Sequence, residues 1–187
     1  GMCAHRPEGL GAIRDRALLL LGYFGAFRRS ELVALNVEDL TYTAGGLVVR
    51  IARSKTDQLG AGASKPISAN RDRRIDPVAA VQAWQAASGI KAGALFRGVR
   101  QGRLLPKRLT AQVVGLVVKR EAGRVGLNPD VFGAHSLRSG FVTTARRRGV
   151  QDRTTRAVTG HRTNYMIDHY DQRDTREALA ELAGVFA

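Results

Sequence analysis

His135 and Arg138 lie three positions apart, and their types and spacing could serve chemistry on a phosphate group. Residues three apart on a helix lie on the same face, so the imidazole and the guanidinium could both reach one phosphate. Cleaving a phosphodiester without a metal needs a nucleophile, cations on the non-bridging oxygens and an acid for the departing oxygen. A His-x-x-Arg spacing alone occurs by chance in many chains, so the rest of the sequence must decide whether this pair is functional.

The context supplies the missing groups. Gly160-His161 is followed nine residues later by Tyr170, a possible nucleophile. The upstream segment 26–32, Ala-Phe-Arg-Arg-Ser-Glu-Leu, contains a further candidate cation, Arg28. A phenol has a pKa of about 10, so Tyr170 would need proton removal and a strongly cationic pocket to attack at neutral pH. Two arginines would provide that field.

Taken in chain order, these motifs resemble those of the phage-integrase family of tyrosine recombinases. That pattern is an Arg in a Gly-Leu-Arg-x-Ser-Glu-Leu-like segment, a Lys on a β-hairpin, His-x-x-Arg, Gly-His, and a Tyr nine residues beyond that His. The positions are filled by Arg28, Lys55, His135, Arg138, His161 and Tyr170. The resemblance covers most of the chain and implies a mainly α catalytic domain with a small antiparallel β-sheet, an α+β fold.

The resemblance also implies a reaction, site-specific DNA recombination through a 3′-phosphotyrosyl intermediate. Arg28 and Arg138 would clamp the scissile phosphate. His135 would assist proton transfer from the tyrosine, and Lys55 would protonate the departing 5′ oxygen. His161 would donate a hydrogen bond to the phosphate. The covalent link keeps the phosphodiester energy, so a second 5′ hydroxyl can rejoin the strand without ATP.

Three nearby residues compete for these positions. Arg29 follows Arg28, but the Ser-Glu-Leu after it fixes the register in favour of Arg28. Lys65 also lies near the predicted hairpin, whereas Lys55 directly follows its strand and fits better. Tyr165 lies only four residues beyond the Gly-His histidine and breaks the spacing.

Helices are the main elements expected to position these residues. Apolar periodicity and capping signals predict helices over 13–25, 30–35, 77–88, 111–122 and 136–148, then shorter pieces and an amphipathic stretch over Thr175–Ala183. Asp76 and Thr110 are predicted to cap two of them. The run Leu47–Ala52 and the later Lys65-Pro66-Ile67 predict a small antiparallel sheet around a polar loop over 54–64.

A basic segment follows the third predicted helix and is expected to be a loop. Because it has few apolar residues, we expect it either to contact the DNA backbone or simply to be solvated. Its basic residues are Arg97, Arg100, Arg103, Lys107 and Arg108.

Net charge points to a polyanionic partner. The chain has 30 Lys and Arg against 16 Asp and Glu, a formal net charge of +14. Such an excess favours phosphate binding through counterion release, and it ranks DNA or RNA above an anionic membrane or a solubilising surface. The family resemblance implies double-stranded DNA. No apolar run reaches the roughly 18 residues of a membrane span. The single cysteine and the histidine spacing show no metal-ligand motif, so neither metal nor cofactor is expected.

The domain prediction is one catalytic domain over 1–187. Residues 1–10 would be a linker or tag remnant and residues 171–187 a helical tail, with the amino-terminal DNA-clamping domain of the resembling family absent. The expected partners are DNA and, on paired sites, three further copies in a homotetramer, with a monomer in the absence of DNA. The expected location is cytoplasmic, at the nucleoid. The rival interpretations are type IB topoisomerase-like DNA relaxation and a non-catalytic DNA-binding module of the same fold.

Overall fold

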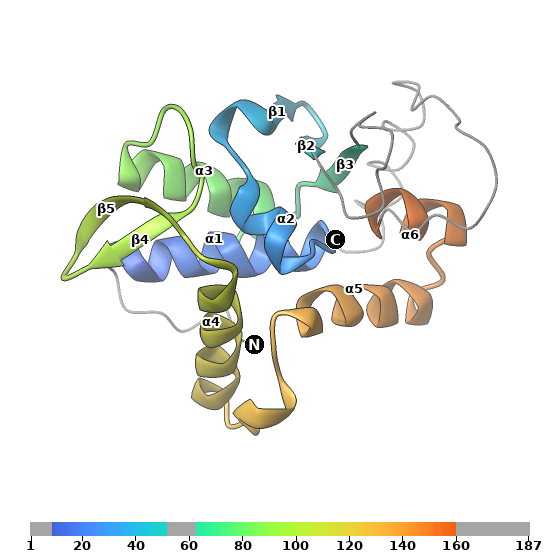
Figure 1. The fold of residues 1–187 in the computed structure, drawn as a ribbon. Helices are drawn as coiled ribbons and strands as arrows, with labels where there is room; N and C mark the ends of the chain where they lie inside the picture. The colour runs from blue at the N-terminus through green and yellow to red at the C-terminus, as the bar shows by residue number, and fades with distance from the viewer. Residues whose placement is uncertain (1–8, 52–62, 160–187) are drawn as a thin grey trace.

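The computed structural model describes residues 9–51 and 63–159 of the chain. Lys55, Tyr165, His161, Tyr170 and the stretch 175–183 therefore lie outside the described residues. The helices are α1 (Leu10–Phe24), α2 (Arg29–Ala34), α3 (Pro77–Ser88), α4 (Ala111–Arg124), α5 (His135–Arg147) and α6 (Asp152–Thr159), with 3-10 turns η1 (Val37–Asp39) and η2 (Pro129–Val131). Figure 1 shows these helices together with two small sheets.

Both sheets are antiparallel. β1 (Leu40–Thr43), β2 (Gly46–Ile51) and β3 (Ala63–Ser68) pair in the order β1-β2-β3, and β4 (Arg97–Arg100) pairs with β5 (Arg103–Arg108). The predicted class, mainly helical with a small antiparallel sheet, is confirmed. The second sheet was not expected.

Helix α1 is the centre of the core. Its leucine-rich middle is wholly enclosed, and Ala17, Leu18 and Leu21 are 0% exposed. α3 packs along α1 and contributes Trp84, whose indole Nε1 donates to the Leu95 carbonyl at 2.7 Å. α1 runs across the molecule in Figure 1 and leads directly into α2, and it also packs against β3 and α5.

The capping predictions met different outcomes. The Asp76 side chain accepts from the Val78 amide at 2.9 Å, with Pro77 in the first turn, so that prediction is confirmed. Thr110 stands at the start of α4 but makes no side-chain capping hydrogen bond, so that one is wrong. α4 also continues past Gly123 to Arg124. A glycine inside a helix costs little when its neighbours pack well, as Ala122 does here at 0% exposed.

The predicted loop over 97–108 is instead the β4–β5 hairpin. Gln101 and Gly102 have φ angles of 49° and 74°, the left-handed conformation that both central residues of a tight hairpin turn need. Gly102 adopts it without cost, and this Gln-Gly pair was the sequence signal for the turn. The hairpin projects from the body beside the start of α1 (Figure 1).

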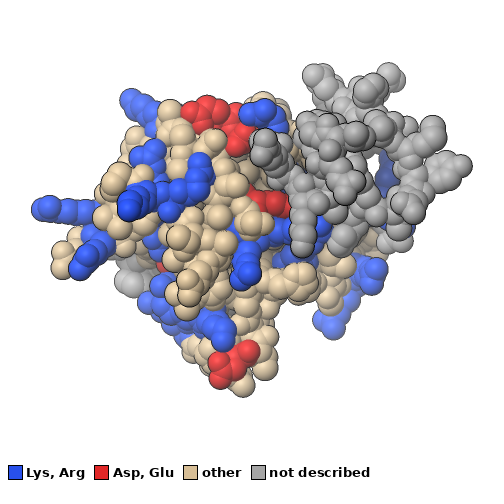
Figure 2. All heavy atoms as spheres, in the orientation of Figure 1, with Lys and Arg blue, Asp and Glu red and all other residues tan. Residues whose placement is uncertain are grey.

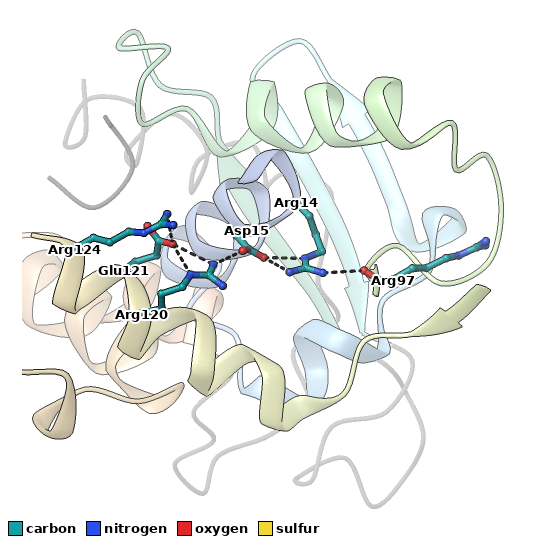
Figure 3. A network of polar contacts seen from close by, with 6 residues as sticks. All are labelled: Arg14, Asp15, Arg97, Arg120, Glu121 and Arg124. Carbon is teal, nitrogen blue, oxygen red and sulfur yellow. Dashed lines mark hydrogen bonds and ion pairs between the residues drawn. The ribbon is translucent and has the colours of Figure 1, made fainter. Parts of the chain in front are cut away.

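A chain of ion pairs joins α1 to α4 (Figure 3). Asp15, 2% exposed, accepts from the adjacent Arg14 at 2.8 Å and also pairs with Arg120 of α4. Glu121, 1% exposed, accepts from Arg120 at 3.1 Å and from Arg124 at 3.2 Å. Buried carboxylates need such partners, because an unpaired charge inside a protein is strongly unfavourable.

We predict that Asp15→Asn lowers the free energy of unfolding by about 3 kcal/mol, because the amide cannot neutralise two guanidinium groups. Chemical denaturation monitored by circular dichroism measures this. Asp130→Asn is the matched control, since Asp130 is 88% exposed and pairs with Lys119 only at the surface. It should change stability by less than about 0.5 kcal/mol. Equal losses in both variants would contradict the prediction.

Candidate active site

The site begins at the turn between α1 and α2, residues 25–27. Gly25 is required there, because a Cβ on it would lie 2.2 Å from the Phe27 ring. Ala26 has a φ of 45°, in the left-handed region that a non-glycine residue seldom occupies. The amides of Ala26 and Phe27 donate back to Tyr23 and Gly22 at 3.0 Å each. The turn is therefore closed tightly at the end of α1, just before Arg28.

Arg28 is anchored by Glu31, one turn further along α2. Its Nη1 donates to Glu31 Oε1 at 2.6 Å, and its backbone amide donates to Glu31 Oε2 at 3.1 Å. The Arg28 side chain keeps 28% of its surface exposed, whereas that of Glu31 keeps 4%. Arg29 is exposed. Of the two candidate arginines, Arg28 is the one that the structure places in a network of buried charges.

Arg138 of α5 reaches the same turn from a distant part of the chain. Its Nη1 donates to the Ala26 carbonyl at 2.8 Å, and the residue is 4% exposed. Its Nη2 is buried without a hydrogen-bond partner within 9–51 and 63–159. Burial lowers the pKa of Arg138, and repulsion from Arg28 adds to that effect while Glu31 opposes it.

Lys65 of β3 is the third cation of the group. Its Nζ donates to the carbonyls of Gly25 at 3.0 Å and Ala26 at 3.4 Å, and lies 3.7 Å from Glu31 Oε2. Burial lowers its pKa to about 7, although Glu31 counteracts this. Sequence analysis weighed Lys65 only as a rival to Lys55 and missed this position. β3 shows no alternation of buried and exposed residues, because Lys65 and the three residues after it are all buried, so no sequence pattern marked this lysine as an inward-facing charge.

We call Arg28, Glu31, Lys65 and Arg138 the cationic cluster. Its positive charges outnumber its negative charge. Three basic side chains surround one carboxylate. Burial raises the pKa of Glu31, but Lys65 and the hydrogen bonds from Arg28 outweigh it and keep the value below normal. Its two guanidinium groups are close enough to repel each other, and one donor of Arg138 is unused among the described residues. The cluster is therefore suited to bind an anion such as a phosphodiester.

His135 is the first residue of α5, one turn before Arg138, and is exposed. It thus stands at the same end of α5 as Arg138 and is open to solvent. The structure brings together Arg28, Arg138 and the α5 end that bears His135. Lys55, His161 and Tyr170 lie outside the described residues, and their assignments stay predictions.

The basic hairpin residues divide into two kinds. Arg97 donates to the carbonyls of Ala94 at 3.2 Å and Ala92 at 3.0 Å, while Arg108 donates to those of Val33 at 2.7 Å and Leu35 at 2.9 Å. These two side chains fasten the hairpin to the body. Arg108 is exposed but engaged in this way, whereas the other three are exposed without such bonds to the described residues, namely Arg100, Arg103 and Lys107. Figure 2 shows basic side chains projecting at the edge where the hairpin lies.

Within the described ranges, no three His, Cys, Asp or Glu side chains come together in a way that could hold a metal ion. No described helix is long and apolar enough to cross a membrane.

Solved structures share this fold. The XerH site-specific recombinase bound to difH substrate aligns with 95% of this chain and 49% of its own, at 19% identity and a TM-score of 0.62. The integrase from mycobacterium phage Brujita aligns with 100% of this chain and 60% of its own, at 21% identity and a TM-score of 0.65. At these identities the likeness shows the fold.

Sequence relatives carry the comparison further. An integrase/recombinase xerD homolog from Selenomonas ruminantium is 39% identical over 164 residues, 87% of this chain and 48% of that protein. The tyrosine recombinase XerC of Herpetosiphon aurantiacus is 32% identical over 195 residues, 96% of this chain and 57% of that protein. The chain thus spans about half the length of the curated relatives it matches. A sequence model of the phage integrase family matches residues 3–177, and the chain therefore belongs to that family of tyrosine recombinases.

Proposed function

We propose that this chain is the catalytic part of a site-specific DNA recombinase, which cleaves and rejoins strands without a metal through a 3′-phosphotyrosine on Tyr170. The observation that carries the proposal is the buried Arg138 guanidinium beside Arg28, with an Nη2 that has no partner among the described residues. A buried donor left unused costs free energy, and a phosphate oxygen would satisfy it.

Each role follows from charge and position. Arg28 and Arg138 would hold the non-bridging oxygens and stabilise the charge that develops as the phenol oxygen attacks. His135, exposed at the start of α5, is the group proposed to accept the tyrosine proton. Lys55 would protonate the departing 5′ oxygen, and His161 would donate to the phosphate. The reaction would take place on DNA of the nucleoid, in the cytoplasm.

The first test is a covalent adduct, sought with nicked duplexes of randomised sequence around the nick, because the target site is unknown. The wild-type chain should form an adduct on a denaturing gel, in excess chelator, since arginines rather than a metal would neutralise the phosphate. Tyr170→Phe should form none while retaining noncovalent binding, because it loses only the hydroxyl.

Tyr165→Phe is the matched control and should form the adduct normally. An adduct that survives in Tyr170→Phe, or that maps to Tyr165, would refute the nucleophile assignment. Noncovalent binding without any adduct would favour the DNA-binding module. An adduct that only relaxes supercoiled plasmid, with no exchange between partners, would favour topoisomerase-like activity.

A second prediction concerns the exposed part of the hairpin. Replacing Arg100 and Arg103 with Ala should reduce the slope of log affinity against log salt by about 1.8, because each lost phosphate contact removes about 0.9. Fluorescence anisotropy with duplex DNA at several salt concentrations measures it. Lys119→Ala, which removes an exposed charge that pairs with Asp130, should leave the slope unchanged. An unaltered slope in the double variant would exclude the hairpin from the DNA interface.

The third prediction concerns assembly. We propose a monomer in free solution and a homotetramer on paired DNA sites, held by the apolar face over 175–183 that sequence periodicity indicates. Sedimentation should show the larger species only with DNA, and deletion of residues 175–187 should abolish it while the thermal transition persists. Loss of the transition on deletion would mean that this stretch belongs to the core of its own domain, against the proposal.

A further inference from the structure

Lys65 is buried and charged, yet nothing in the proposed reaction uses it. Its side chain is 4% exposed, so its Nζ cannot touch DNA in this arrangement. All of its polar contacts described above lie inside the protein, on the carbonyls of Gly25 and Ala26 and on Glu31. The ammonium also stands over the Phe27 ring, 4.7 Å from the centroid.

These contacts all converge on the segment that presents Arg28. The Ala26 carbonyl accepts from Lys65 and from Arg138, so one backbone oxygen joins β3 and α5. Ala26 is held in a left-handed conformation that an alanine seldom adopts, and such a conformation persists only where the surroundings enforce it. Two cationic donors on its carbonyl supply that enforcement.

The second route runs through Glu31. Its Oε1 accepts from the Arg28 guanidinium, while its Oε2 accepts from the Arg28 amide and faces Lys65. Glu31 thus orients Arg28 from both ends and is itself held by Lys65. Removing the ammonium would leave Glu31, 4% exposed, with Arg28 as its principal cation, and would draw Arg28 towards the carboxylate.

We propose that Lys65 is a positioning residue, which holds the turn 25–27 and Glu31 so that Arg28 and Arg138 together present their guanidinium groups to the scissile phosphate. That the arginines bind a scissile phosphate rests on the proposed function. That Lys65 holds the arginines in place rests on the geometry alone. Lys65 acts in its charged form, because a neutral amine would neither attract Glu31 nor donate as strongly to two carbonyls.

The proton on Lys65 responds to several charges. Glu31 favours the charged form, while burial and the charges of Arg138 and Arg28 disfavour it. Among the other elements packed on β3, α3 has no charged residue, and Arg50 of β2 pairs with Asp39. The charges of α1 engage elsewhere, Arg14 with Asp15 and Arg16 with the Arg73 carbonyl. Arg153 and Arg156 of α6 are not among the groups that shift this pKa.

The experiment compares the wild-type chain with Lys65→Met, which keeps the length and removes the charge, and Lys65→Arg, which keeps the charge. On the nicked substrate, Lys65→Met should cleave about 10- to 100-fold more slowly, because a displaced catalytic group loses rate on this scale. Its affinity for DNA should change by less than about threefold, a loss in the chemical step rather than in binding. Lys65→Arg should restore most of the rate. Lys119→Met is the control for removal of an exposed lysine and should match the wild type.

The pH profile separates positioning from plain stability. The ratio of the wild-type cleavage rate to that of Lys65→Arg should fall as pH rises from about 6 to 9, because the lysine loses its proton and arginine does not. Groups shared by both proteins cancel in this ratio. A constant ratio, or a Lys65→Met rate equal to that of the wild type, would overturn the proposal.

Two measurements need no activity and decide the proposal even if no adduct ever forms. In NMR spectra, the Nε–H signals of Arg28 and Arg138 should both shift in Lys65→Met and return in Lys65→Arg. Unmoved signals would overturn the positioning role, whereas absence of a wild-type adduct would overturn only the proposed function.

The last measurement is stability against pH. The unfolded chain holds the Lys65 proton up to a pKa of 10.5, while the folded chain releases it near 7. The unfolded state therefore binds more protons between these values, and the free energy of unfolding should rise with pH there, relative to Lys65→Met. If the difference in unfolding free energy between the wild type and Lys65→Met stayed constant over this pH range, Lys65 would not be buried as described, and the proposal would be overturned.

Discussion

The carbonyl oxygen of Ala26 is the point at which the three parts of the site meet. It belongs to the turn that ends α1, it accepts from Arg138 of α5, and it accepts from Lys65 of β3. Because the turn is closed against Phe27 with no room for a side chain on Gly25, the carbonyl cannot turn away without opening the end of α1. The place of Arg28, two residues later, is thereby tied to the packing of the central helix.

Two groups of buried charge serve different ends. In the α1–α4 network, the carboxylates of Asp15 and Glu121 are met by Arg14, Arg120 and Arg124, which joins two helices (Figure 3). In the cationic cluster, three basic side chains meet the single carboxylate of Glu31, and a buried donor on Arg138 is left over. A structural network closes on itself, whereas the leftover donor and excess charge of the cluster suit it to an outside anion. The hairpin arginines divide in a similar way. Arg97 and Arg108 donate to carbonyls of their own chain, whereas Arg100 and Arg103 project into solvent.

Local signals in the sequence predicted local structure well. Asp76-Pro77 specified the start of α3, because a carboxylate cap and a proline each act within a few residues. The mainly helical class and the strand over β2 followed from apolar periodicity in the same way. The β4–β5 hairpin was missed because half of its strand residues are basic and neither strand alternates between buried and exposed residues, so only the Gln-Gly turn gave a cue.

By itself, the sequence determined the family and the candidate residues, since the order and spacing of Arg28, His135, Arg138 and the Gly-His and Tyr motifs can be read along one chain. Tertiary structure alone decided what surrounds them. Arg138 and Ala26 are 112 residues apart, and Lys65 and Ala26 are 39 apart, so no periodicity connects them. Which lysine is buried, which arginine keeps an unused donor and which hairpin arginines are engaged depend on how α1, β3 and α5 pack. Burial and hydrogen bonding of a charge are properties of that packing, because they are set by atoms that the chain brings together only when it folds.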